Sequence, residues 1–587
     1  MKRWPSWLPQ AVCAALLASF ICQQATIVRD GPGLLDADGH LDRTANVYTR
    51  LRTGDPGISD QLGTPSWGEP ATQLLASSAP YPGGYVAAWL PVLALSAGDT
   101  GGMRAFSSGL VGAGLVLAGL LAAELAGAWA AVGTLAALVG MPVVGALAGS
   151  CTIDTLLFPL VLLACWTLVR GDGFRRVGSG VGFGLVAVVA LSVRWTAAPL
   201  VVPLALLTGL RVLGTGSTRG VVLLAALVLG SAIALGGALT GRWAPGALHP
   251  GVPWAMGVLG TGGALLVAAR ARRGGALPLM RLAIAVALVL GPGLGWYWHH
   301  ADAVALYVAS QRHQASAVSP GGAVRVAGSV IQQLGTGYTV LLPLGVFAGL
   351  RARRRTEALV LVGTGFVALL ALVGSGSPEL FTMGSIGARL LLGPASLLAL
   401  AMGLLVAGAG RGAPWVALPI VVLATWTTWS FRVPLCAPKQ RDYAVYRICA
   451  RTGPMVSWAL GTPNPGPARR IEDVLDPTPT PRIVAVLTVD RRLWRADEGP
   501  YVRALVRGNR AVTVVEVEPD GVGPWLDAWR DRVDDVVLVG LPAALAAPFP
   551  VVTSTPLDLG PGAPRATLLV GPGRSGIPGS FRSTTTP

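Results

Sequence analysis

Long apolar runs separated by short polar turns fill most of the chain between residues 8 and 430. A helix that crosses a bilayer needs about 20 mainly apolar residues. On that basis the pattern predicts thirteen spans, at residues 8–27, 105–126, 129–149, 153–169, 178–193, 197–213, 220–239, 254–269, 277–297, 335–350, 357–373, 391–409 and 414–430. We therefore expect a polytopic α-helical membrane protein.

The arginines between these runs give the expected protein an orientation. With the N-terminus in the cytoplasm, nearly all strong basic clusters fall in cytoplasmic turns: Lys2 and Arg3, residues 170–176, Arg211 and Arg219, residues 270–273, residues 351–355, and Arg411. Cytoplasmic loops of membrane proteins carry such an excess of basic residues. Because the number of spans is odd, the C-terminus is expected on the outer side of the membrane.

Composition agrees with the membrane class. Apolar residues make up 52% and charged residues 13% of the 587, and the mean hydropathy is +0.59. The net charge of +16 is explained by the turns above, so nucleic-acid binding is not expected. Only two of 45 basic residues are lysines, which together with the abundant Ala, Gly, Val and Leu indicates a GC-rich bacterial genome and hence the bacterial plasma (inner) membrane.

Two segments between the first and second spans resemble interfacial helices. In the first outer loop, residues 28–104, apolar residues recur at helical spacing from Leu41 to Leu51, which predicts an amphipathic helix on the membrane surface. Residues 80–98 are apolar but interrupted by prolines and glycines, and counting them as a span would invert every later loop. We expect a second interfacial helix there.

The composition changes after residue 430. Residues 431–481 are rich in proline and predict a linker, and residues 482–575 alternate short apolar runs with helical patterns, which predicts a small outer α/β domain. Residues 576–587 predict a disordered tail. The six cysteines show no zinc-binding spacing, and Cys436 and Cys449 fit either a disulfide or two free thiols.

Charged residues collect at the predicted outer ends of the spans. The stretch 34–56 carries Asp36, Asp38, His40 and Asp42 directly after the first span, and Asp154, Arg194 and Arg389 lie at outer ends further along. Charged groups near a membrane are costly unless they are solvated or used. Asp38 followed by Gly39 also fits a helix cap and a tight turn.

The order of these motifs resembles the glycosyltransferase-C superfamily, especially the bacterial branch akin to protein O-mannosyltransferases and to the aminoarabinose transferase of lipid A. The parallels, in chain order, are Asp38, Asp55, the stretch 81–98, Asp154, Arg194, "GPGLGWYWHH" and "GARLLLGP", with Gly83 in place of a usual proline, Arg194 in place of a usual lysine and Leu390 in place of a usual tyrosine. The resemblance covers about residues 1–430.

The resemblance implies a transferase that moves a sugar from a polyprenyl-phosphate carrier to an extracytoplasmic acceptor, with inversion. It implies Asp38 as the base that takes the acceptor's proton, Asp154 as an acid that orients acceptor or sugar, and Arg194 and Arg389 as binders of the lipid phosphate. Asp36, His40 and Glu69 complete the set as candidates for substrate binding, and Asp36 is also the alternative to Asp38 as the base. Some relatives use a divalent metal and others use none, and the sequence does not decide between them.

Each candidate has a structural alternative. Asp154 fits the cap of a span beside Thr152, Arg194 and Arg389 fit interfacial anchors, and Glu69 fits a solvated loop. His299, His300 and Asp302 fit either a metal site at the rim or solvated side chains. For the whole chain, the rivals are a transporter or lipid flippase, which usually shows repeated halves that are not evident here, and a noncatalytic partner in cell-envelope glycan assembly.

Overall fold

The structure is a computed structural model. It describes residues 5–30, 44, 83–96, 100–148, 151–176, 178–214, 276–299, 327–328, 330–331, 333–375, 390–430, 449–450, 458–459, 482–489, 510–529, 533–557 and 565–572. The spans expected at 220–239 and 254–269 lie outside these residues. So do the tail from 576 and, apart from Thr44, the amphipathic helix expected from Leu41 to Leu51.

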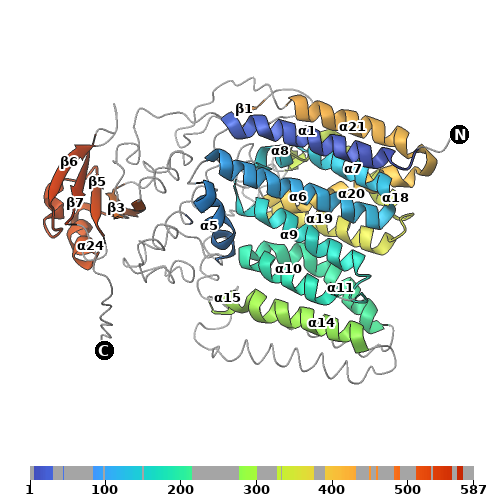
Figure 1. The fold of residues 1–587 in the computed structure, drawn as a ribbon, viewed down its shortest axis with the longest axis horizontal. Helices are drawn as coiled ribbons and strands as arrows, with labels where there is room; N and C mark the ends of the chain where they lie inside the picture. The colour runs from blue at the N-terminus through green and yellow to red at the C-terminus, as the bar shows by residue number, and fades with distance from the viewer. Residues whose placement is uncertain are drawn as a thin grey trace.

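The described part of the first 430 residues is almost entirely helical (Figure 1). Its longer elements are α1 (Leu8–Asp30), α5 (Gly84–Ser96), α6 (Thr100–Ala126), α7 (Ala128–Gly140), α8 (Pro142–Ala148), α9 (Ile153–Arg170), α10 (Ser179–Val193), α11 (Ala198–Gly214), α14 (Ala276–Leu288), α15 (Leu294–His299), α18 (Thr336–Gly349), α19 (Arg355–Ser375), α20 (Leu392–Gly408) and α21 (Ala413–Ser430). Wherever an expected span is described, helix begins and ends within five residues of the expected bounds.

Two expected spans are interrupted at a proline. The residue before a proline is driven out of the helical region by steric contact with the proline ring. Met141 accordingly has φ −74° and ψ 120°, so the segment expected as one span at 129–149 is divided into α7 and α8. The span expected at 277–297 contains a π-helical turn, Val289–Gly293, around Pro292, because proline cannot donate the regular helical hydrogen bond.

The chain is a helical membrane protein. Among the described residues, three helices are long and apolar enough to cross a membrane: Gly102–Ala126, Ile153–Arg170 and Met280–Tyr297. The segments Leu392–Gly408 and Gly410–Thr427 meet the same test together, with a bend of 107° between them. Several other apolar helices are shorter, among them α5 with 13 residues. The count of thirteen spans stays a prediction.

Small residues allow the central helices to pack closely. α7 lies against α20, and a Cβ added to Gly133 of α7 would stand 2.6 Å from the Met402 carbonyl oxygen and 3.0 Å from the Gly403 Cα. A Cβ on Gly403 would in turn meet the Ala130 backbone. Close backbone approach through glycine is typical of helix pairs in membranes, where van der Waals packing drives association.

The two ends of the helical bundle differ in charge. α9 ends, α10 begins, α18 ends and α19 begins at one end, which carries residues 170–176 and 351–355 with seven arginines; we call it the arginine end. α9 begins and α10 ends at the opposite end, to the left in Figure 1, where α5 and α15 also lie.

The C-terminal region contains a five-stranded sheet, drawn beside the helices in Figure 1. Its strands are β3 (Arg482–Thr488), β4 (Arg510–Glu516), β5 (Asp535–Val539), β6 (Thr553–Leu557) and β7 (Ala566–Val570), in the order β4-β3-β5-β7-β6. β4, β3 and β5 pair in parallel, β7 pairs antiparallel with β5, and β6 pairs antiparallel with β7. The helix α24 (Val522–Trp529) packs its buried face, with Trp525 stacked on Trp529, against the sheet.

A short ladder and an edge strand were not expected from the sequence. β1 (Cys449–Ala450) and β2 (Trp458–Ala459) pair within the region expected as a linker. β6 has the sequence TSTPL and is almost wholly exposed, so it lacks the apolar residues that mark a buried strand. It contains Pro556, which an edge strand tolerates. The bounds expected for the C-terminal domain stay a prediction.

Arg482 joins the ends of three strands of the sheet. Its Nε donates to Asp535 Oδ2 at 2.7 Å and its Nη2 to Asp535 Oδ1 at 2.5 Å, while Nη2 also donates to the carbonyl oxygens of Asp534 and Gly571. The hydrogen bond with Asp535 raises the pKa of Arg482 above its ordinary value. A raised pKa means that this stabilisation is complete below the ordinary arginine pKa and is lost only above it, so neutral pH leaves it intact.

We expect Arg482→Ala to lower the stability of the sheet by about 3 kcal/mol, because Asp535, 1% exposed, would lose its bidentate cation. Amide exchange of β3 and β5 in increasing denaturant measures the effect. Arg565→Ala is the matched control, since Arg565 is exposed at the start of β7. Equal exchange in the two variants would contradict the role given to Arg482.

Candidate functional site

Asp154 lies in the first turn of α9. Thr152, the N-cap residue, is extended, with φ −78° and ψ 163°, and its side chain makes no capping hydrogen bond. An acid in this first turn interacts favourably with the positive end of the helix dipole. The Asp154 side chain is only 7% exposed, which is costly for a carboxylate that has no compensating partner.

Arg194 lies directly after the last turn of α10. Its amide donates to the Ala190 carbonyl oxygen at 2.9 Å, and its own backbone is extended, with φ −164° and ψ 139°. The chain then passes through a short 3-10 turn, Trp195–Ala197, into α11. The Arg194 side chain is 7% exposed, so it does not reach toward water as an interfacial anchor does.

The carboxylate of Asp154 and the guanidinium of Arg194 form a buried ion pair. Arg194 Nη1 donates to Asp154 Oδ1 at 3.2 Å and to Oδ2 at 3.1 Å. α9 and α10 are antiparallel neighbours, so the start of one and the end of the other meet although the two residues are 40 positions apart. A buried ion pair contributes little to stability on balance, so its presence in an apolar bundle favours a functional role.

The end of α1 is tied to the same region. Gln24 donates from Nε2 to the Gly145 carbonyl oxygen of α8 at 3.2 Å, and Ser108 of α6 donates to Gln24 Oε1 at 3.5 Å. α8 leads toward the start of α9. This part of α1 is therefore anchored to α6 and to α8, the helix that precedes α9 in the chain.

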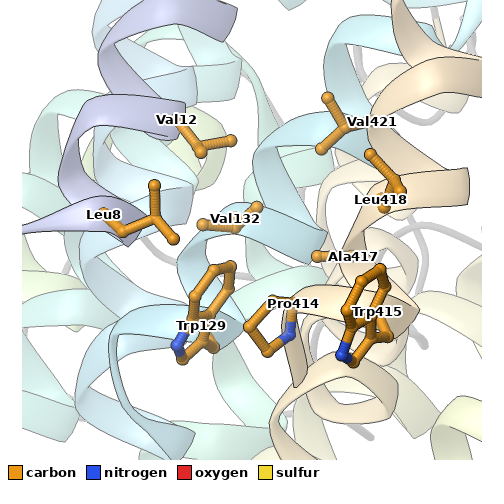
Figure 2. Close-up of a pocket in the computed structure, with 9 residues that line it drawn as sticks. All are labelled: Leu8, Val12, Trp129, Val132, Pro414, Trp415, Ala417, Leu418 and Val421. Atoms are coloured by element: carbon orange, nitrogen blue, oxygen red, sulfur yellow. The ribbon is translucent and has the colours of Figure 1, made fainter. Parts of the chain in front are cut away.

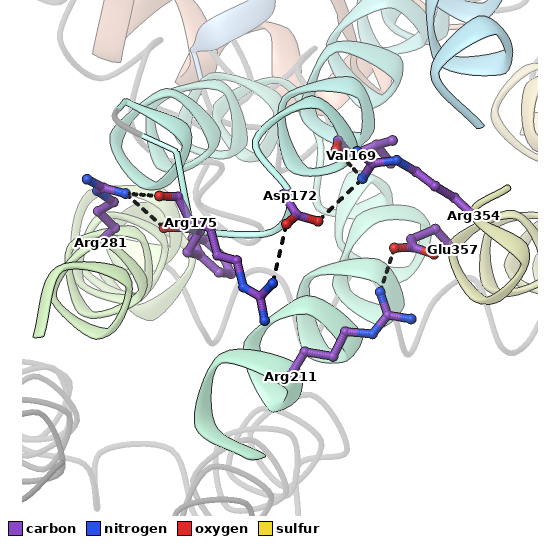
Figure 3. Close-up of polar contacts among 8 residues, drawn as sticks. Val169, Asp172, Arg175, Arg211, Arg281, Arg354 and Glu357 are labelled. Atoms are coloured by element: carbon purple, nitrogen blue, oxygen red, sulfur yellow. Dashed lines mark hydrogen bonds and ion pairs between the residues drawn. The ribbon is translucent and has the colours of Figure 1, made fainter. Parts of the chain in front are cut away.

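Ion pairs at the arginine end join turns that are far apart in the sequence (Figure 3). Arg354 lies 3.6 Å from Asp172 and donates to the Val169 carbonyl oxygen at 2.7 Å. Arg211 of α11 lies 2.5 Å from Glu357 of α19. These acids neutralise only part of the charge, because Arg175, Arg176, Arg351, Arg353 and Arg355 are also exposed there. The surplus is the pattern that cytoplasmic turns show.

The topology predicts opposite labelling of the two ends. A single cysteine in place of Ala459, in a background without native cysteines, is expected to react with a membrane-impermeant thiol reagent in intact cells, because the thirteen spans predicted from the sequence would put this region outside. A cysteine in place of Arg353 is the control and is expected to react only after the membrane is opened. Protection of the first cysteine would overturn the odd count.

Five of the predicted site residues, Asp36, Asp38, His40, Glu69 and Arg389, lie outside the described residues. Among the predicted site residues that the structure does describe, it brings Asp154 and Arg194 together. His300 and Asp302 are not described, and the described residues contain no group of three side chains suited to a metal.

An apolar cavity of about 220 Å³ lies between α1, α7 and α21 (Figure 2). Its lining residues come from the first halves of these helices: Leu8, Val12, Trp129, Val132, Pro414, Trp415, Ala417, Leu418 and Val421. Since no charged side chain lines it, it offers no partner for a phosphate. It is separate from the ion pair.

The class that the described residues define is a helical membrane protein with a buried acid–arginine pair at one end of its helices. No family model matches the chain, and no curated protein matches it. The chain is similar to the crystal structure of ArnT from Cupriavidus metallidurans in the apo state, with 16% identity, 96% of this chain and 97% of that chain covered, and a TM-score of 0.33.

It is also similar to the crystal structure of the same ArnT bound to undecaprenyl phosphate, with 15% identity, 96% and 98% of the two chains covered, and a TM-score of 0.31. ArnT is an aminoarabinose transferase of the glycosyltransferase-C superfamily.

Proposed function

We propose that this chain is a membrane glycosyltransferase that moves a sugar from a polyprenyl-phosphate carrier to an acceptor on the outer side of a bacterial inner membrane. The observation that carries the proposal is the buried pair of Asp154 and Arg194 at the end of the bundle opposite the arginine end. Groups that are charged, buried and costly in a membrane protein mark substrate sites more often than structural ones.

The proposed reaction breaks the bond between the anomeric carbon and the phosphate oxygen of the carrier. The acceptor oxygen or nitrogen forms a new bond to that carbon on the opposite face and loses its proton to Asp38. The bonding electrons leave with the carrier phosphate, which gains one negative charge. Stabilising that charge and taking that proton are the two tasks that the protein must perform.

Arg194 fits the first of these tasks. A guanidinium carries five N–H donors in one plane and binds phosphate oxygens in pairs. Asp154 contacts Nη1 with both carboxylate oxygens, so it holds one end of the guanidinium in place. We assign Asp154 this orienting role, in addition to the contact with acceptor or sugar expected from the resemblance, and Arg389 a second contact with the phosphate.

The remaining candidates belong to the outer loop. We propose that Asp38 takes the proton of the acceptor, and that Asp36, His40 and Glu69 contribute to substrate binding. α1 supports this arrangement, because Gln24 ties its end to α6 and α8 near the start of α9.

The test is turnover of lipid-linked sugars by the purified protein in lipid nanodiscs. A panel of polyprenyl-phosphate sugars is offered with membrane lipids, glycans and peptides as acceptors, and release of the free carrier phosphate is measured. We expect release with at least one donor and acceptor pair. No release from any carrier, together with movement of a labelled carrier across the bilayer of a proteoliposome, would replace the transferase with a flippase.

A further inference from the structure

Tyr85 fixes the backbone just before Asp154. Its hydroxyl donates to the Cys151 carbonyl oxygen at 2.5 Å, and the Cys151 amide donates to Ser107 Oγ at 3.1 Å. All three residues are buried. Cys151 has φ 54°, a left-handed conformation that is strained for a residue with a side chain and persists only where its surroundings enforce it. Tyr85 and Ser107 hold both of its backbone groups.

Tyr297 fixes the backbone just before Arg194. Its hydroxyl donates to the Leu191 carbonyl oxygen at 2.7 Å, and it is 6% exposed. The last four carbonyl groups of a helix have no partner within the helix. Tyr297 supplies one for Leu191 at the point where the chain leaves α10 and becomes extended at Arg194.

The two hydrogen bonds are arranged alike. Each tyrosine comes from an element outside the α9–α10 pair, and each accepting carbonyl lies three residues before one member of the ion pair. α5 contacts both turns. Tyr85 bonds to Cys151 before α9, and Gly84 lies so close to the Ser192 backbone of α10 that a Cβ at this position would collide with it. The first two residues of α5 thus meet the start of α9 and the end of α10 together.

We propose that Tyr85 and Tyr297 are positioning residues for the ion pair: they hold the carboxylate of Asp154 and the guanidinium of Arg194 at the places that sugar transfer requires. Neither acts on the substrate, since each acts through the backbone of a neighbouring turn. The inference rests on the proposed transferase function for its effect on turnover. Its structural part, that the hydroxyls hold these two turns, is independent of that function.

Loss of a positioning residue has a characteristic kinetic effect. Charge on the leaving phosphate develops mainly in the transition state, so a displaced guanidinium weakens transition-state binding more than carrier binding. Tyr85→Phe and Tyr297→Phe remove one hydroxyl each and keep the ring and its packing. We expect each to lower kcat about tenfold or more while the KM for the carrier changes less than about threefold.

Tyr338→Phe is the matched control. Tyr338 is a buried tyrosine of α18 that lies against Gly140 of α7, so Tyr338→Phe removes a buried hydroxyl that donates to neither of the two turns beside the ion pair. We expect its kcat to equal that of the unaltered protein, and the three variants to share one unfolding midpoint within a few degrees. A fall in kcat that is equal in all three variants would overturn the proposal.

Amide exchange separates this inference from the proposed function. In Tyr85→Phe we expect the amides of residues 151–155, and in Tyr297→Phe the Arg194 amide, to exchange about tenfold faster, with the middle of α9 unchanged. If the unaltered protein transfers no sugar, the proposed function fails, and amide exchange alone then tests whether the two tyrosines hold these turns. Unchanged exchange at these amides, or unchanged kcat in both variants of an active enzyme, would overturn the positioning role.

Discussion

Replacement of Arg194 by alanine is expected to lower the free energy of unfolding by about 3–5 kcal/mol. The reason is the environment of its partner: the Asp154 side chain is 7% exposed, and the substitution removes the cation that lies 3.1 Å from it. An ionised carboxylate without this partner would carry an uncompensated desolvation cost. Unfolding of the purified protein in a titration with denaturing detergent measures the change.

The chain supplies a matched control for this experiment. Arg170 and Glu124 also lie 3.1 Å apart, but their side chains are 55% and 31% exposed at the arginine end. An ion pair of this kind contributes less than about 1 kcal/mol, because water screens it. Arg170→Ala is therefore expected to leave stability nearly unchanged. If the two alanine variants lose the same stability, burial is not what makes the Asp154–Arg194 pair matter.

The double variant Asp154→Asn, Arg194→Met separates stability from function. It removes both charges and keeps similar volumes, and a buried ion pair replaced in this way often loses no stability. We expect its unfolding midpoint to return to near that of the unaltered protein. Because it lacks the guanidinium, it tests the role of the pair in a folded protein.

Replacement of Asp38 by asparagine is expected to abolish sugar transfer, with a loss of more than about 10³-fold in kcat. General base catalysis typically contributes 10²- to 10⁴-fold, and an amide cannot take the proton of the acceptor. Carrier binding is expected to change little, because the residue is assigned to the acceptor side. Single-turnover release of the carrier phosphate gives the rate, and a titration with a labelled carrier gives the affinity.

Asp36→Asn is the control for Asp38→Asn, since the two acids lie two positions apart in the same stretch. Because Asp36 is assigned to substrate binding, we expect Asp36→Asn to raise KM and to lower kcat far less than Asp38→Asn does. Transfer that survives in Asp38→Asn and is lost in Asp36→Asn would exchange the two roles, and transfer that survives in both would place the base elsewhere.

The sequence was sufficient for the helices that the structure describes, because the property that defines a span, a continuous apolar run, is local. It also indicated that Asp154, at the start of its helix, and Arg194, at the end of its helix, lie at the same end of the bundle, from the alternation of spans and the position of the arginines. Their pairing could not be predicted, because it depends on the packing of α9 against α10 and on which helix faces meet.

The roles of the positioning residues could not be predicted from the sequence for a related reason. Tyr85 and Tyr297 both belong to stretches that the sequence marks as motifs, yet their partners are backbone carbonyls, which leave no trace in a sequence. Pro142 indicates a helix break locally, but the apolar run around it is long enough for one span, so one span was predicted there. The exposed edge strand β6 carried no apolar alternation at all.

The most direct test of the central claim is carrier turnover by the double variant Asp154→Asn, Arg194→Met in the same nanodiscs as the unaltered protein. If the buried pair serves the phosphate of the carrier, the unaltered protein releases free carrier and the double variant, folded to the same extent, does so at least about 100-fold more slowly. Release at an equal rate by both proteins would contradict the account.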